Sequence, residues 1–255
     1  MKALILAGGF GTRLSEETDL VPKPLVEIGG RPIIWHLMKI YSAAGINEFV
    51  VLCGYKGFLL KRYFAQYQLY NSDVFIDIKN NRMEYTQRES EPWRIWLVDT
   101  GLNTMTGGRV RRVRDLVGDE TFCLTYGDGL SDVNVSDIIA DHRKRKKFAT
   151  VMAVPSPGRF GVLDMSEDGA VDRFAEKPAN EMGYINAGFF VLEPEIFDYL
   201  KDDTTVWEEE PLRRLALDGQ LHAYRHHGFW RPMDSLRDKR ELEALWSGNP
   251  PWKLW

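Results

Sequence analysis

The first residues of the chain combine three features that suit a phosphate ligand. "MKALILAGGFGTRLSEETDLVPKPLVEIGG" begins with an apolar run, continues with glycines and Arg13, and then places Lys23 between Pro22 and Pro24. Glycines let backbone N–H groups approach an anion, and arginine adds a forked donor that stays charged. The prolines stiffen the loop that carries Lys23. The stretch therefore predicts a phosphate-binding loop with two fixed cations, against the alternatives of a plain glycine turn and a solvated lysine.

The spacing of this loop argues against two familiar nucleotide-binding motifs. No G-x-x-x-x-G-K-[ST] sequence is present, and a dinucleotide fingerprint starting at Gly9 would need a glycine where Leu14 stands. The next predicted strand ends in "CGYKG", without the acidic residue that holds a ribose. A P-loop enzyme and a dehydrogenase are therefore disfavoured.

Two separated aspartates are candidates for a metal site. Asp128 lies in "TYGDG" at the end of a predicted strand, and Asp234 lies in "RPMDSLRD" directly before a predicted helix. Mg²⁺ is usually held by one or two carboxylates together with substrate phosphates. A turn aspartate and a helix N-cap are the alternatives. Together with the glycine loop, the pair predicts a site for a polyphosphate with Mg²⁺.

Further polar residues suit a sugar phosphate. "FAEKP" places Glu176 beside Lys177, so that a carboxylate can accept sugar hydroxyls while an ammonium meets a phosphate; an exposed ion pair is the alternative. Gly161 in "PGRFG" and Asn186 in "YINAGFF" are compatible with a polyol pocket.

Arg109 is a candidate on the nucleotide side. It follows two glycines at the start of the predicted helix "TGGRVRRVRDLVG", which favours a ligand role. The alternative is that it is one solvated charge among the neighbouring arginines 111, 112 and 114.

The elements that position these residues follow an alternating pattern. Apolar runs bounded by glycine predict strands, and apolar residues at helical spacing predict the helices between them. Such crossover units imply a mostly parallel sheet with helices on both faces, an α/β Rossmann-like architecture whose ligands lie beyond the carboxyl ends of the strands. The predicted strands span 2–7, 48–54, 93–101 and 121–129, the helices 31–45, 55–67, 106–118 and 135–146, and the segments to inspect are 8–13, 54–57, 99–109 and 126–129.

After residue 148 the pattern changes to short β segments at 148–155, 160–177 and 184–194, followed by helices at 193–201, 208–219 and 235–246. No linker or repeat separates the parts. We expect a single domain, 1–255, with a nucleotide-binding half over about 1–148 and a smaller β-rich, sugar-binding lobe with the C-terminal helices over about 149–255.

The composition limits the function class. The chain has 255 residues and a net charge of −4, which argues against bulk nucleic-acid binding. No stretch predicts a membrane helix or a signal peptide, so we expect a cytoplasmic protein. Cys53 and Cys123 lie in apolar runs and are expected in the core. The tryptophan-rich C-terminus predicts either docked core or a subunit contact.

Several motifs together resemble the sugar-1-phosphate nucleotidylyltransferases. "LAGGFGTRL" followed by "VPKPLVEIGGRPII" matches their opening pattern of G-G-x-G-T-R-L and P-K-P. The later motifs resemble the cytidylyltransferase branch of that family; they are "CGYKG", "EPWRIWLVDTG", "MTGGR", "TYGDG", "PGRFG", "EKP", "INAGFFVLEP", "TTVWEEEPL" and "GFWRPMDSLRDK".

The resemblance implies Mg²⁺-dependent transfer of a cytidylyl group from CTP to α-D-glucose 1-phosphate, as a supply step for dideoxysugars of surface polysaccharides. UTP, dTTP or another hexose 1-phosphate are alternatives, as is a nucleotide-sugar binding protein without turnover. It also implies a homo-oligomer, a hexamer or a trimer. By the same resemblance, catalysis falls to Arg13, Lys23 and Asp128, the metal to Asp128 and Asp234, and the sugar phosphate to Gly161, Glu176, Lys177 and Asn186. Nucleotide binding falls to Leu6, Ala7, Gly8, Gly9, Phe10, Gly11, Thr12, Arg13, Lys23, Thr106, Arg109 and Gly127, where Thr106 and Arg109 read the base or fix the loop beside it.

Overall fold

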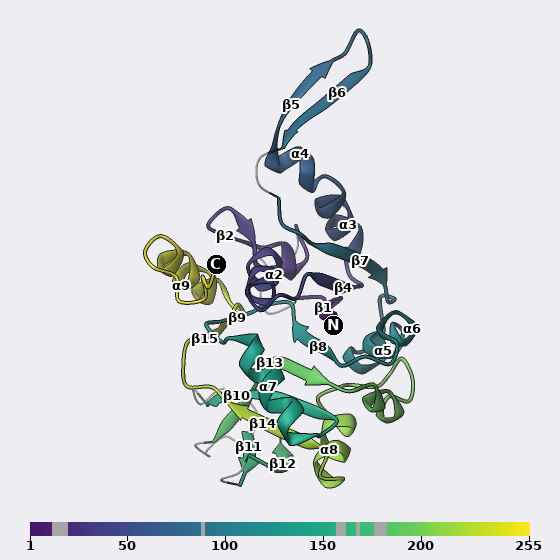
Figure 1. Ribbon diagram of the computed structural model, residues 1–255, viewed down its shortest axis with the longest axis vertical. Helices are drawn as coiled ribbons and strands as arrows, with labels where there is room; N and C mark the ends of the chain where they lie inside the picture. The colour runs from purple at the N-terminus through teal and green to yellow at the C-terminus, as the bar shows by residue number, and fades with distance from the viewer. Residues whose placement is uncertain (12–19, 88–89, 157–161, 167–168, 176–182) are drawn as a thin grey trace.

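A computed structural model covers the 255-residue chain and describes residues 1–11, 20–87, 90–156, 162–166, 169–175 and 183–255 (Figure 1). Its centre is one mixed β-sheet flanked by helices. The predicted α/β architecture is therefore confirmed.

Four parallel strands form the part of the sheet that carries the candidate site. Their order across the sheet is β8, β1, β4 and β7, and each pairs in parallel with its neighbour. The register sets Ala7 beside Cys53, and Cys53 beside Asp99, so these strands end at one edge. The strands span Ala3–Ala7 (β1), Glu48–Cys53 (β4), Arg94–Asp99 (β7) and Phe122–Tyr126 (β8).

The strands of the second half continue the same sheet. β13 pairs antiparallel with β8 and also with β10 and β11, and β14 extends the sheet beside β10. The two halves on either side of residue 148 thus share one sheet and its two cores. These strands span Ala149–Pro155 (β10), Val162–Met165 (β11), Val171–Ala175 (β12), Tyr184–Leu192 (β13) and Leu221–Arg225 (β14).

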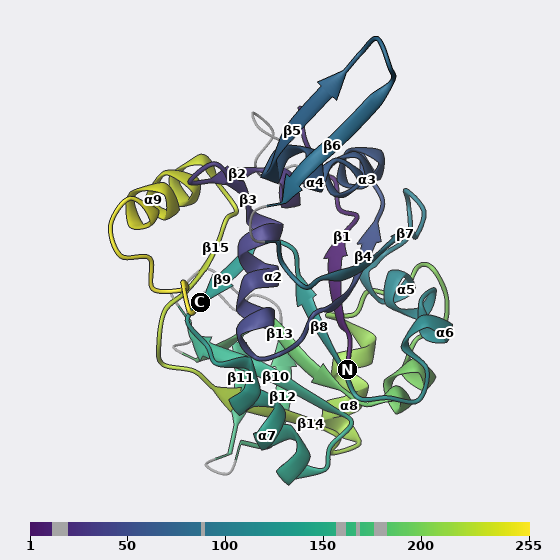
Figure 2. The same ribbon diagram turned by 45° about the horizontal axis from the view of Figure 1, so that its top comes forward.

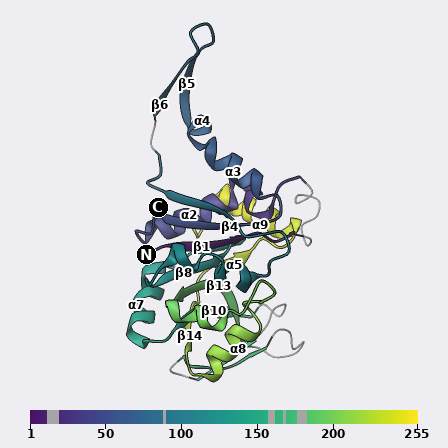
Figure 3. The same cartoon turned by 90° about the vertical axis from the view of Figure 1, so that its right-hand side faces the viewer.

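Alternating side chains of the strands fill two cores, one on each face of the sheet. In β1, Ile5 belongs to one core and Leu4 to the other. Figures 2 and 3 show helices on both sides of the sheet. The core that contains Ile5 is covered by α2 (Ile33–Ala43), α3 (Gly57–Ala65), α7 (Val135–Arg145) and α9 (Leu236–Trp246), and the core that contains Leu4 by α5 (Thr106–Arg111), α6 (Arg114–Val117), the 3₁₀ helix η3 (Pro194–Tyr199) and α8 (Glu210–Leu217).

Two predicted helices differ in detail. The helix expected over 106–118 is broken after Arg111 into α5 and α6, although Val110, Val113 and Val117 all remain buried on one side. The helix expected over 193–201 is the 3₁₀ helix η3, with Pro194 at its first position. Proline has no backbone N–H, but the N–H at the first helical position has no partner within the helix, so proline suits the start of a short helical turn.

A β-hairpin that lies between β4 and β7 in the chain was not predicted from the sequence. β5 (Ser72–Asp77) pairs antiparallel with β6 (Arg82–Gln87), and the pair follows the short helix α4 (Tyr67–Asn71). It projects from the body of the molecule (Figure 1, Figure 3). Because side chains on both of its faces are exposed, its sequence lacks the alternation that marks a half-buried strand. Two short antiparallel pairs were also not predicted. They are β2 (Glu27–Ile28) with β3 (Arg31–Pro32), and β9 (Gly129–Ser131) with β15 (Trp230–Pro232).

The C-terminal tail packs on the body of the same chain. Trp252 is fully buried, and its indole N–H donates to Nδ1 of His36 on α2. Trp246 lies against Gly29, where a Cβ atom would meet the indole ring at 1.8 Å. The sequence left two alternatives for this tail, docked core or a subunit contact, and these two tryptophans are docked on the core of their own chain. Both cysteines are buried as predicted.

Within the described part of the chain, none of the helices has the length and apolar character to cross a membrane.

Candidate active site

The loops after the four parallel strands meet at one edge of the sheet, as predicted. Tyr55 N donates to the carbonyl of Gly8 at 3.2 Å, and Gly127 N donates to the carbonyl of Leu6 at 3.1 Å. A Cβ atom at position 127 would lie 2.7 Å from that same carbonyl, so only glycine allows this approach. The glycine loop is thereby held between the ends of β4 and β8.

Lys23 lies between the two aspartates that the sequence singled out. Its Nζ is 2.6 Å from Oδ2 of Asp128 and 2.7 Å from Oδ1 of Asp234. The three side chains are 13%, 26% and 24% exposed, so they form a half-buried cluster that remains open to ligands. Residues distant in the sequence thus converge on one cationic centre.

Local pairing explains how the two aspartates meet. Asp128 directly precedes β9, and one residue, Met233, separates Asp234 from the end of β15. β9 and β15 pair antiparallel with Gly129 opposite Pro232, and Met233 N donates to the carbonyl of Asp128 at 2.9 Å. Lys23 reaches them from the 3₁₀ turn Lys23–Leu25 (η2), which Pro22 and Pro24 hold in place.

The charge of Lys23 is stabilised by its partners. Burial alone lowers the pKa of Lys23, but the two negative charges and their hydrogen bonds outweigh it, so the pKa lies above its ordinary value. The lysine is therefore a permanent cation.

The same two carboxylates fit a divalent ion. Both already converge on a positive charge, and hard oxygen ligands are what Mg²⁺ prefers. No group of three or more His, Cys, Asp or Glu side chains with metal-binding geometry occurs among the residues that the structure describes. Two carboxylates suffice for Mg²⁺ only where phosphate oxygens and water complete its shell.

Two adjoining cavities surround this cluster. The first, of about 430 Å³, contains Lys23 and both aspartates; its lining is Leu6, Ala7, Gly9, Gly11, Lys23, Pro24, Thr106, Gly127, Asp128 and Asp234. The second, of about 740 Å³, shares five of these residues and extends to the loop after β7; its further lining is Gly8, Phe10, Leu102, Asn103, Thr104, Met105, Arg109, Tyr126, Val206 and Glu208. One ligand can therefore place a phosphate end in the first cavity and a larger, more apolar end in the second.

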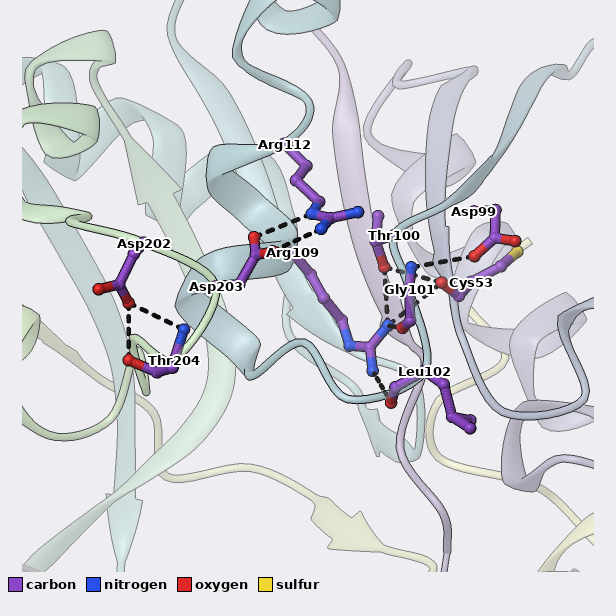
Figure 4. A network of polar contacts seen from close by, with 10 residues as sticks. All are labelled: Cys53, Asp99, Thr100, Gly101, Leu102, Arg109, Arg112, Asp202, Asp203 and Thr204. Carbon is purple, nitrogen blue, oxygen red and sulfur yellow. Dashed lines mark hydrogen bonds and ion pairs between the residues drawn. The ribbon is translucent and has the colours of Figure 1, made fainter.

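Arg109 is buried and clamps the loops that line the second cavity (Figure 4). It is 5% exposed, and its guanidinium donates to the carbonyls of Gly8, Cys53, Gly101 and Leu102 and to the hydroxyl of Thr100, at 2.7–3.2 Å. Burial lowers the pKa of Arg109, and the nearby Asp99 charge opposes this effect. Nη1 makes three of these bonds and Nη2 makes two, so the surrounding loops engage both terminal nitrogens of the guanidinium. Its contacts favour the role of fixing the loop over that of reading a base.

The neighbouring arginines differ from Arg109. Arg111 and Arg114 are exposed, and Arg112 forms an ion pair with Asp203, in which Nε lies 2.9 Å from Oδ1 (Figure 4). The solvated-charge alternative therefore describes these residues and not Arg109.

Thr106 and Asn186 are held by partners from other elements. The Thr106 hydroxyl donates to Glu208 and accepts from the backbone of Trp207. Asn186 donates to the Tyr126 hydroxyl at 3.0 Å and accepts from Gly188 N at 2.7 Å, so its amide lies behind Tyr126 and does not line either cavity. Glu208 and Tyr126 line the second cavity and were not among the predicted site residues. The motif "TTVWEEEPL" marked the segment of Glu208 but not its side chain.

The remaining predicted residues lie outside the described part of the chain. They are Thr12 and Arg13 of the glycine loop, and Gly161, Glu176 and Lys177 of the sugar side.

Comparison with known proteins gives full-length relatives. The family model described as "Nucleotidyl transferase" matches residues 2–232. The chain is 54% identical over 257 residues to "Glucose-1-phosphate cytidylyltransferase" of Salmonella typhi, covering 100% of both chains. The protein of the same name from Salmonella typhimurium is also 54% identical over 257 residues, again with 100% of both covered.

A solved structure described as UDP-glucose pyrophosphorylase complexed with UDP-glucose has the same fold. It superimposes with a TM-score of 0.74 at 20% identity, covering 96% of this chain and 98% of that one.

Proposed function

Because this chain belongs to the nucleotidyl transferase family, we propose that it transfers a cytidylyl group from CTP to α-D-glucose 1-phosphate, giving CDP-glucose and pyrophosphate. Relatives of that printed name match it over its whole length. The observation that carries the proposal is the convergence of Lys23, Asp128 and Asp234 in the cavity beside the glycine loop. Such a cluster suits a polyphosphate that arrives with its own cation.

The reaction needs positioning and charge stabilisation more than acid–base chemistry. An anionic phosphate oxygen of the sugar phosphate attacks the α-phosphorus of CTP, a new P–O bond forms, and the bond to the β-phosphate oxygen breaks. The electron pair leaves with pyrophosphate, and no enzyme group forms a covalent bond. Fixed cations and backbone N–H groups that face the developing charge lower the barrier of such a transfer.

Lys23 is the described residue best placed for this task. It projects into the first cavity from a stiff turn, and the two aspartates fix the position of its ammonium. In the proposed complex a nucleotide phosphate draws Lys23 from the aspartates. Arg13, predicted to face the departing pyrophosphate, completes the set of cations.

Mg²⁺ is part of the proposal, with Asp128 and Asp234 as its protein ligands. When bound, it would neutralise phosphate charge and orient the triphosphate. The sugar phosphate is assigned to Glu176, Lys177 and Gly161, while Asn186 supports this side from behind Tyr126.

We also propose a cytoplasmic homo-oligomer that supplies CDP-glucose for dideoxysugars. The β5–β6 hairpin supports the assembly, because a two-stranded hairpin alone is marginally stable in water. It exposes Phe75, Ile76 and Ile78, with Ile78 at 89% exposure, and a second copy of the chain would cover them. Light scattering should detect an oligomer that the double variant Phe75→Ser/Ile78→Ser dissociates; a monomeric wild type would contradict this assembly.

Pyrophosphate release tests the function. Purified protein is incubated with α-D-glucose 1-phosphate and Mg²⁺, with CTP, UTP, dTTP, ATP or GTP in parallel. We expect strong preference for CTP and no release when EDTA removes the metal. Preference for another nucleotide would contradict the cytidylyl assignment. Absence of pyrophosphate release with all five nucleotides would contradict catalysis on this sugar phosphate.

A further inference from the structure

Glu208 is a carboxylate in the second cavity that lies near two hydroxyl groups. The first is that of Thr106, at the start of α5. Thr106 Oγ1 accepts the backbone N–H of Trp207 at 2.9 Å, so its single hydrogen points to Oε2 of Glu208 at 2.6 Å. The carboxylate is thereby tied to the helix that carries Arg109.

The second hydroxyl is that of Tyr126, at the end of β8. Its oxygen accepts from Asn186 Nδ2 at 3.0 Å, and both Tyr126 and Glu208 line the second cavity. Since the amide supplies the hydrogen of this bond, the hydroxyl hydrogen of Tyr126 remains available to another acceptor. Burial and the nearby Glu208 charge raise the pKa of Tyr126 well above its ordinary value, so this donor stays protonated.

The bond from Thr106 does not use all the acceptor sites of the carboxylate. An ionised carboxylate offers about four acceptor sites and no donor. In the described residues, Glu208 takes part in no ion pair. Its remaining acceptor capacity is available to a donor in the cavity that it lines. The side chain is therefore prepared to accept, and unable to donate.

The position of Glu208 within the site selects which part of a nucleotide it meets. The phosphates belong to the first cavity, where Lys23 lies, and Glu208 does not line that cavity. A negative carboxylate also repels phosphates. The nucleoside must extend into the second cavity, between the glycine loop and the loop that Arg109 clamps.

We propose that Glu208 selects the base, accepting a hydrogen bond from the exocyclic 4-amino group of cytosine. This inference rests on the proposed function and names the residue that favours CTP over UTP and dTTP. Uracil and thymine carry a carbonyl oxygen at position 4, so an acceptor would face an acceptor. Carboxylates pair with the cytosine amine in the same way in nucleic-acid recognition.

The test compares kcat/KM for CTP and for UTP in wild type, Glu208→Gln and a control variant. The control is Glu209→Gln, because Glu209 is the next residue in the chain and its side chain is exposed. A glutamine amide can both accept and donate, so it no longer rejects a carbonyl. We expect the CTP:UTP ratio to fall at least about tenfold in Glu208→Gln, mainly through KM, and to stay unchanged in the control. An unchanged ratio in Glu208→Gln would overturn the inference.

Two further substrate pairs separate base selection from other roles. CTP against dCTP reports a contact with the ribose, and glucose 1-phosphate against galactose 1-phosphate reports a contact with the sugar. A change confined to either of these ratios would overturn the proposal. Glu208→Asp, which retracts the carboxylate but keeps its charge, gives the same comparison if Glu208→Gln does not fold, and we expect its CTP:UTP ratio to fall.

The wild-type measurement separates this inference from the proposed function. If wild type prefers a nucleotide other than CTP, the proposed function fails. If wild type prefers CTP and both Glu208 variants keep that preference, only the role of Glu208 fails.

Discussion

At the scale of single residues, the cluster of Lys23 with Asp128 and Asp234 decides the chemistry. An isolated lysine between prolines or an isolated turn aspartate has an ordinary structural explanation. Their convergence at 2.6 and 2.7 Å in a half-buried cavity is costly to build, because each charge loses water. Such a cluster is expected where a charged ligand exchanges with the internal partners.

Substituting Asp128→Asn should reduce turnover by at least about a hundredfold, because the neutral amide weakens the proposed metal site. Pyrophosphate release at saturating substrate measures the loss, and circular dichroism checks that the fold is kept. The control is Asp119→Asn, at an exposed position before β8, which should remain fully active. A folded Asp128→Asn enzyme with wild-type turnover would remove the metal assignment.

Substituting Lys23→Ala should lower kcat by at least about a hundredfold with a smaller effect on KM, since a cation that meets charge developing in the transition state acts on the chemical step. Steady-state kinetics with varied CTP measure both constants. Lys144→Ala, on the exposed end of α7, is the control. If only KM rises, Lys23 binds ground state and transition state alike.

At the scale of elements, Arg109 joins segments that the chain brings from four places. Its guanidinium holds the glycine loop after β1, the end of β4 and the turn after β7, while its backbone lies within α5. A Cβ atom at Gly8 or at Gly54 would lie 2.3 or 2.4 Å from Arg109 Nη1, so both glycines make room for the clamp. Gly8 of the glycine loop and Gly54 after β4 thus serve the packing of the clamp, whether or not an anion is bound.

Substituting Arg109→Met should destabilise the protein by about 2–5 kcal/mol, because it leaves buried carbonyls without their donor. Urea unfolding at pH 7.5 measures this change. Arg111→Met, at an exposed position on the same helix, should change stability by less than about 0.5 kcal/mol. Equal stabilities of the two variants would contradict the clamp.

At the scale of the whole molecule, His36 connects the first part of the chain to the last. Trp252 donates to its Nδ1, so the neutral ring carries its proton on Nε2 and donates to the carbonyl of Ile28 at 2.8 Å. Burial lowers the pKa of His36 to about 4, although the bond to Ile28 opposes this effect. The docked tail therefore requires an uncharged imidazole.

The stability of the protein should accordingly fall in mild acid. The unfolded chain protonates His36 near its ordinary pKa, and the folded chain only near the lowered one, so the unfolded state binds more protons between pH 6.5 and 4. This contribution is lost progressively as pH falls through that window, and amounts to about 3 kcal/mol. Urea unfolding from pH 7.5 to 4.5 should show a shallower loss for His36→Gln than for wild type. The exposed His227→Gln should follow wild type; if His36→Gln does so too, the linkage is wrong.

The sequence by itself determined most of the strands and helices, the mostly parallel character of the sheet in the first half, and the loops that carry the site. These features rest on local patterns, because burial of a strand or helix face repeats every few residues. It also identified Lys23, Asp128 and Asp234 as site residues, because the prolines and glycines beside Lys23 and Asp128 and the helix after Asp234 mark special positions of the backbone. It missed the β5–β6 hairpin, whose exposed side chains carry no such pattern.

Only the tertiary structure decided how those side chains are used. Lys23 bridges residues that lie 105 and 211 positions away, and Arg109 is a buried clamp although its exposed neighbours have the same chemistry. Glu208 lines the second cavity and is held there by the hydroxyl of Thr106 from another element. Each of these roles depends on which elements pack together, and not on the identity of adjacent residues. A charged side chain has many acceptable environments, and its fold selects one of them by desolvation and by the partners within reach.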